Sequence, residues 1–151
     1  MGMARPQKNR IVKAPPLYSS FKPTGVMRKQ LDQILLTLDE YEAIRLADYL
    51  EKEQEEAASE MEISRPTFTR LVETARKKIA SFIIEGKELY IEGGSIHFLG
   101  NIIRCLECEG TFSAGFDGKI VFCPTCGSKR IVDLAVGYGH GNCCRRNLGN
   151  K

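Results

Sequence analysis

The chain has 151 residues, enough for one medium domain or two small ones. Hydrophobic residues make up 42% and charged residues 27%, and no apolar run approaches the ~20 residues that span a bilayer. No basic start followed by an apolar segment opens the chain, so we expect a cytoplasmic protein without a secretory signal or membrane partner.

The formal net charge of +3 is distributed unevenly along the chain. Residues 1–36 hold seven basic residues and one acidic residue, residues 37–63 hold two and ten, and residues 64–87 hold six and two. This order favours one cationic face that binds nucleic acid. The alternative is solvated surface with a cationic tail, and charge alone does not separate the two.

Residues 1–36 are predicted to form a basic arm. Prolines prevent a continuous helix over its first 23 residues and favour extended backbone. Such an arm can follow a minor groove and contact phosphates, and the alternative is a partly disordered terminus. Within the arm, residues 27–36 are expected to form a short helix, because Leu31, Ile34 and Leu35 fall at helical spacing.

Residues 37–94 are predicted to form a three-helix domain. Thr37 and Glu40 have the spacing of a capping box, and the helix that they start is expected to end near Leu50. The second helix is expected over residues 53–61. Its adjacent alanines let another helix cross closely, and its glutamates should face away from phosphates.

The third helix is expected to begin after the N-cap residue Ser64 and to end at the C-cap residue Gly86. Steps of three and four predict one core stripe, made of Phe68, Leu71, Val72, Ala75, Ile79, Phe82 and Ile83. Polar and basic residues occupy the first turns: Arg65, Pro66, Thr67, Thr69 and Arg70. Arg76 and Lys77 follow further along and are expected to contact phosphates.

A helix with two small residues, a short turn and a capped basic helix together indicate a helix-turn-helix. In that motif the first turns of the last helix enter the major groove, where Arg binds guanine and Thr contacts a base edge or the thymine methyl. We therefore expect a mainly α fold that binds double-stranded DNA. The alternative for the same helices is a domain that binds protein.

Several separate runs within residues 4–94 resemble the uncharacterised family called domain of unknown function one-three-four. The runs are Arg5-Pro6, Phe21-Lys22-Pro23, Leu36–Asp48, Gln54–Ala58, Ser64–Phe68, Ala75–Ala80 and Ile91–Gly94. That family is described as predicted DNA-binding, with a helix-turn-helix similar to region four of sigma factors. The resemblance implies sequence-specific duplex binding and transcriptional regulation, but no target. The chain departs from the family where residues 49–53 replace a Gly-containing turn.

Residues 95–136 contain two Cys-x-x-Cys pairs with fourteen residues between them: Cys105, Cys108, Cys123 and Cys126. This spacing predicts a small β zinc ribbon with one Cys₄ site. Four thiolates leave no open position, so the zinc is expected to be structural. Iron is the alternative, because the Cys-Pro-x-Cys-Gly turn resembles that of rubredoxin, and a disulfide is less favoured.

Short strands are expected around these cysteines. Residues 89–91 and 95–98 flank Gly93-Gly94 and predict a hairpin. Residues 111–114 and 119–122 predict two more strands between the cysteine pairs.

Residues 137–151 are glycine-rich and predict a flexible tail. The alternative is a redox or metal sensor, because the tail contains His140, Cys143 and Cys144.

The sequence as a whole predicts a cytoplasmic DNA-binding transcriptional regulator with a structural zinc ribbon. The alternatives are an adaptor that binds RNA polymerase or another regulator, and a redox or metal-sensing iron or zinc protein. An enzyme is not expected, because no nucleophile with a base, phosphate loop or open metal site is visible. A homodimer is compatible with this class, although no heptad is present.

Overall fold

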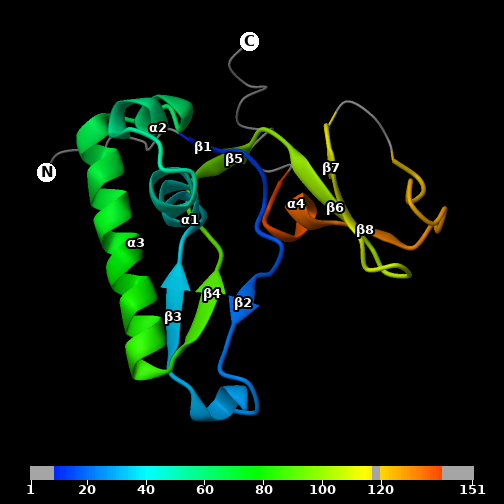
Figure 1. Cartoon of the computed structure of the whole chain (residues 1–151), viewed down its shortest axis with the longest axis horizontal. Coiled ribbons are helices and arrows are strands. Elements are labelled where there is room, and N and C mark those ends of the chain that lie inside the picture. Colours follow the sequence, from blue (N-terminus) through cyan, green and yellow to red (C-terminus); the bar gives the residue numbers. More distant parts are fainter. Residues whose placement is uncertain (1–8, 117–119, 141–151) are drawn as a thin grey trace, which may run out of the picture.

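Along the sequence, three helices separate two strands that pair with each other in one sheet (Figure 1). The computed structural model describes residues 9–116 and 120–140. In chain order the region contains β3 (Gln33–Leu36), α1 (Leu38–Ile44), the π-helix η2 (Arg45–Tyr49), α2 (Gln54–Glu60), α3 (Arg65–Glu85) and β4 (Glu88–Ile91). β4 pairs in parallel with β3 and antiparallel with β2 (Ser20–Phe21). The fold is therefore mixed α/β, and the prediction of a mainly α domain is corrected.

The helix boundaries follow the local capping signals. The Glu40 carboxylate accepts the Thr37 backbone N–H at 3.1 Å, which confirms the capping box, and η2 carries the helix on to Tyr49. Ser64 caps α3 by accepting the Thr67 N–H. At the other end of α3, Gly86 adopts a left-handed conformation with φ of 64°. The three predicted helices are thus confirmed within a few residues.

The α2–α3 pair packs through small and medium side chains. Ala57, Ala58 and Met61 are buried against Phe68 and Val72 of α3, and the partly buried Ile63 fills the turn between the helices. The predicted core stripe of α3 has one error. Ile83 is 66% exposed, because it lies to the side of the face that packs on the sheet.

The predicted helix over residues 27–36 is wrong. The structure has only the 3₁₀ turn η1 (Arg28–Gln30) there, followed by strand β3. Along β3 the side chains alternate between outside and inside, with Gln33 and Leu35 exposed and Leu36 buried. Pairing with β4 therefore overrides a helical spacing that rests on few apolar residues.

The predicted hairpin around Gly93-Gly94 is also wrong. Strands exist on both sides, but β4 pairs with β2 and β3, whereas β5 (Ile96–Phe98) pairs in parallel with β1 (Arg10–Val12). Both glycines have positive φ, so the chain turns there from one sheet to another. Part of the basic arm is thus ordered as β1 and β2 (Figure 1).

The C-terminal part forms a three-stranded antiparallel sheet. β6 (Asn101–Cys105) lies between β7 (Thr111–Ala114) and β8 (Ile131–Asp133), and a short helix α4 (Leu134–Gly137) follows. The predicted strand at 111–114 is confirmed. The one at 119–122 is not, because residues 120–122 have no strand conformation and Lys119 lies outside the described residues. β8 provides the third strand instead.

Two clusters of buried residues form the core. One lies between α1, α2 and α3. The other joins β1, β3, β4 and β5 to α1 and α3, and it includes Ala135 of α4. The Tyr138 ring meets Phe98 edge to face, and Arg104 donates a hydrogen bond to the Leu17 carbonyl at 2.6 Å. The cysteine-containing part is thus packed on the arm and on the core cluster that includes Phe98 of β5.

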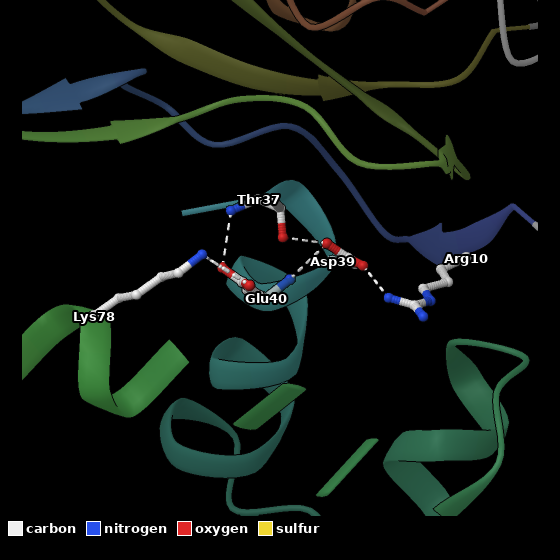
Figure 2. A network of polar contacts seen from close by, with 5 residues as sticks. All are labelled: Arg10, Thr37, Asp39, Glu40 and Lys78. Atoms are coloured by element: carbon white, nitrogen blue, oxygen red, sulfur yellow. Dashed lines mark hydrogen bonds and ion pairs between the residues drawn. The ribbon is translucent and has the colours of Figure 1, made fainter. Parts of the chain in front are cut away.

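A network of polar side chains surrounds the start of α1 (Figure 2). The Asp39 carboxylate accepts hydrogen bonds from Arg10 of β1 and from the Thr37 hydroxyl. Glu40 is held by the Lys78 ammonium of α3 at 2.7 and 2.9 Å. Both carboxylates are buried, so these partners compensate for the loss of water around the charges. The network ties the arm and α3 to α1.

The turn between η2 and α2 has left-handed backbone at a residue with a side chain. Glu51 has a φ of 53°. This is within the segment 49–53 that replaces the Gly-containing turn of the resembling family. A residue with a Cβ is strained in this conformation, whereas glycine is not.

No helix in the described part of the chain is long and apolar enough to cross a membrane.

Glu51→Gly is expected to raise the free energy of unfolding by up to ~1 kcal/mol, because relief of strain exceeds the added flexibility of the unfolded chain. The matched change is Gly86→Ala, where no atom lies within 4 Å of the new Cβ and only backbone strain is added. It should lower stability by ~1 kcal/mol. Urea unfolding measures both. A loss of stability in Glu51→Gly would contradict the assigned turn.

Lys78→Met is expected to lower the free energy of unfolding by ~2–3 kcal/mol, because it leaves the buried Glu40 carboxylate without its cation. The neighbouring exposed Lys77 provides the control, and Lys77→Met should change stability by no more than ~0.5 kcal/mol. Equal effects in denaturant unfolding would show that the Glu40–Lys78 pair does not hold α3.

Candidate metal centre and nucleic-acid interface

Four cysteine side chains meet where the two Cys-x-x-Cys turns approach each other. Their Sγ atoms all lie within 4.8 Å of one another. Cys105 and Cys126 are 3.5 Å apart at Sγ, and Cys108 and Cys123 are 3.8 Å apart. These separations exceed the ~2.05 Å of a disulfide bond, and all four thiols are free.

The local backbone explains why the sulfurs converge. Each Cys-x-x-Cys turn is followed by a left-handed residue, Glu109 with φ of 60° and Gly127 with φ of 76°. The Cys105 N–H donates to the Gly110 carbonyl at 2.9 Å, and the Cys123 N–H donates in the same way to the Ser128 carbonyl at 2.8 Å. Two similar closed turns thus present two sulfurs each.

The turns also change the acidity of the thiols. The backbone N–H of Cys126, together with that of Thr125, lowers the pKa of Cys123 to about 6. The Ser128 N–H lowers the pKa of Cys126, but the neighbouring sulfurs, first that of Cys105 and then those of Cys108 and Cys123, together outweigh it and raise this pKa to about 12. Four close sulfurs therefore do not all ionise alone, and a bound cation favours the thiolate form at each of them.

The cluster fits a four-coordinate metal ion. A tetrahedral ion with metal–sulfur bonds of ~2.3 Å requires sulfurs ~3.8 Å apart, close to the shorter separations observed. Cys105 and Cys123 are buried, while Cys108 and Cys126 are exposed. The four cysteines that the spacing selected are thus brought together, and the geometry alone does not select one metal.

The first turns of α3 carry the residues selected from the sequence for DNA. Pro66 and Arg70 are exposed. The Thr67 N–H donates to the hydroxyl oxygen of the N-cap residue Ser64, and the two hydroxyl oxygens lie 2.8 Å apart. Arg70 makes no ion pair with any residue that the structure describes. The structure therefore leaves the Arg70 guanidinium available to a partner.

Arg65 and Thr69 are held by α2. The Arg65 Nε donates to the Gln54 Oε1 at 3.2 Å, and the Thr69 hydroxyl lies 3.2 Å from the same oxygen. A Glu55 carboxylate oxygen lies 3.7 Å from Arg65 Nη1. From the sequence, the acidic face of α2 was expected to lie away from phosphates. Gln54 was not predicted as a functional residue, because no pattern in the sequence distinguishes its polar side chain.

The basic residues further along α3 differ in their surroundings. Arg76 makes two hydrogen bonds with the Asp48 carboxylate of η2, at 2.6 and 3.0 Å. This pairing lowers the pKa of Asp48. Lys77 is exposed and makes no ion pair within the described residues, whereas Lys78 is bound to Glu40. Of these three cations, Lys77 is thus the one that makes no ion pair with a described residue.

The arm enters beside the turn between α2 and α3. The Ile11 backbone N–H donates to the Met61 carbonyl at 3.1 Å, at the end of α2. The preceding residue, Arg10, forms an ion pair with Asp39. Residues 1–8, with the basic residues of the first part of the arm, lie outside the described residues.

The predicted tail begins with packed residues. His140 stacks on Phe116 with ring centroids 3.8 Å apart, and its ring lies 6.3 Å from that of His97. Burial, then the neighbouring His97, lowers the pKa of His140. Cys143 and Cys144, which the sensor alternative includes with His140, lie outside the described residues.

Comparison with known proteins relates the chain to uncharacterised families. Residues 1–99 match the model of the family described as protein of unknown function DUF134. A UPF0251 protein of Chloroherpeton thalassium is 52% identical over 147 residues, covering 95% of this chain and 97% of the relative. UPF0251 proteins of Moorella thermoacetica and Clostridium acetobutylicum are 39% and 40% identical, over 95% and 86% of this chain and 94% and 91% of the relatives. No solved structure matches the chain.

Cys123→Ser is expected to abolish stoichiometric metal binding and to lower stability by several kcal/mol, because closed four-thiolate sites contribute on the order of 10 kcal/mol to folding. Elemental analysis and thermal unfolding of the purified protein measure the two effects. The control is Cys143→Ser, which changes a cysteine that is not one of the four in the paired motifs. Loss of metal in that control alone would contradict the four-cysteine site.

Proposed function

The chain belongs to the DUF134 family of proteins of unknown function, and we propose a function from the residues exposed on its surface. We infer that it binds double-stranded DNA in a sequence-specific way and regulates transcription. The observation that carries this proposal is the exposed first part of α3, whose Arg70 has no acidic partner among the described residues. The proposal is that α2, the turn and α3 act as a helix-turn-helix.

The reading residues in this proposal are Arg65, Thr67, Thr69 and Arg70. They occupy the first turns of α3, which in this motif face the bases of the major groove. Pro66 lies between them in the first turn, where the helix needs no backbone N–H. Arg side chains would bind guanine O6 and N7, and Thr would contact a base edge or a methyl group.

Phosphate contacts would come from Arg76, Lys77 and the arm. Lys77 makes no ion pair within the described residues, and Arg76 would exchange its exposed Asp48 partner for a phosphate at little cost. The backbone hydrogen bond between Ile11 and Met61 supports a role for the arm, because it holds the arm beside the turn that precedes α3. Phosphate contacts set position and affinity more than sequence preference.

The cysteine cluster is proposed to hold one structural zinc ion in a zinc ribbon. Four sulfur donors occupy every position of a tetrahedral ion, so the ion would stabilise the three-stranded sheet and take no part in a reaction. Iron would fit the same sulfur separations and remains the alternative. Elemental analysis together with the visible spectrum separates them, since a zinc protein is colourless.

A protein-binding adaptor is the second candidate, with RNA polymerase or another regulator as its partner. Exposed apolar residues favour it, namely Ile84 at the end of α3, 83% exposed, and Val121 beside the cysteine cluster, 65% exposed. Duplex affinity that falls steeply with salt supports DNA binding. Binding to a protein that is insensitive to salt, without duplex affinity, supports the adaptor.

Arg70→Ala is expected to weaken binding to the preferred duplex by ~1–3 kcal/mol and to relax the preference at one base pair. The preferred duplex comes from selection of bound sequences in a random pool. Lys77→Ala serves as the comparison, because loss of one phosphate contact should weaken binding to all sequences and reduce the salt slope by ~1. Unchanged binding of Arg70→Ala to every duplex would refute the assigned reading surface.

A further inference from the structure

We propose that Gln54 is the positioning residue of the DNA-reading surface and fixes the guanidinium of Arg65 for base recognition. The inference rests on the proposed function and adds a determinant of its specificity. Gln54 is the first residue of α2, and neither its spacing nor its charge marks it in the sequence. Its role follows from the contacts that it makes across to α3.

The amide oxygen of Gln54 serves two residues of α3. It accepts from Arg65 Nε at 3.2 Å, and it lies 3.2 Å from the hydroxyl of Thr69. These two residues are one helical turn apart, and the Thr69 hydroxyl also lies 3.1 Å from the Arg65 carbonyl. One oxygen on α2 therefore joins two of the four proposed reading side chains.

The contact with Gln54 uses only the Nε–H of Arg65, and the ion-pair partner of its Nη groups among the described residues is the exposed Glu55, 3.7 Å from Nη1. A guanidinium that donates its Nε–H to a fixed oxygen keeps both Nη groups for a bidentate contact, the arrangement in which Arg recognises guanine. Arg65 is 61% exposed, so without this contact its long side chain would sample many rotamers. Holding one rotamer in advance reduces the entropy that binding must remove.

The support for Gln54 comes from a packed element. Ala57 of the same helix is fully buried against α3, so α2 holds its first turn close to the start of α3. The amide N–H groups of Gln54 make no hydrogen bond to any described residue. The side chain therefore acts in this proposal through its oxygen and the two residues of α3 that the oxygen joins.

The neutral charge of Gln54 matters because Glu55 already lies near Arg65, with 3.7 Å between Glu55 Oε1 and Arg65 Nη1. A second carboxylate at position 54 would pair with the guanidinium and repel phosphates. An amide directs Arg65 without neutralising it. Gln54→Glu should therefore weaken binding to all duplexes, which distinguishes charge from geometry.

The test uses the full-length protein and the duplex that it selects from a random pool. Gln54→Ala should weaken binding to this duplex ~5- to 30-fold and reduce discrimination at the base pair that Arg65→Ala affects. Discrimination at the base pair assigned to Arg70, binding to random-sequence duplex and the thermal midpoint should stay close to those of the parent. The loss of affinity caused by Gln54→Ala should be smaller in the Arg65→Ala background than in the parent.

Glu53→Ala is the matched control, because the adjacent Glu53 side chain is exposed and makes no hydrogen bond or ion pair with a described residue. It should retain the full base preference. A Gln54→Ala protein with the parent's base preference, while Arg65→Ala loses it, refutes the positioning role and leaves DNA reading intact. A lower thermal midpoint with equal loss on all duplexes also refutes it, as a purely structural effect. A parent without any preferred duplex refutes both proposals.

Discussion

Buried charge at the start of α1 is the constraint on which the rest of this fold depends. Asp39 and Glu40 are acids in the first turn of a helix, and the fold encloses both. Buried carboxylates require cations, and the chain supplies one from each side, Arg10 from β1 and Lys78 from α3 (Figure 2). These pairs define how the arm and the long helix approach α1. The relation between the arm and the proposed DNA-reading turns follows from this arrangement.

The acidic middle of the chain has a different role from the one that its composition suggests. Ten acidic residues between two basic segments look like a surface that avoids phosphates. In the structure several of them face cations of the third helix instead, as Asp48 does with Arg76 and Glu40 with Lys78. These acidic residues therefore determine which basic residues remain free to bind a polyanion, as much as the number of lysines and arginines does.

Features with local causes could be predicted from the sequence, and features with distant causes could not. The capping box of Thr37, the left-handed Gly86 and the four-cysteine cluster depend on neighbours or on a metal-ligand spacing, and they are found where expected. β3 and β4 pair with each other although three helices separate them in the sequence, so nothing in either short strand identifies its partner. The contact of Gln54 with Arg65 likewise depends on how two helices cross.

The position of Ala135 has a consequence for how this protein can be divided. The match to the family model ends at residue 99, just after β5, yet the core that includes Val12 and Phe98 is completed by Ala135, with Tyr138 packed against it. A fragment cut at the family boundary would expose this apolar surface to solvent. The folding unit is therefore longer than the segment by which the family is recognised, and shortened versions should keep the chain through residue 140.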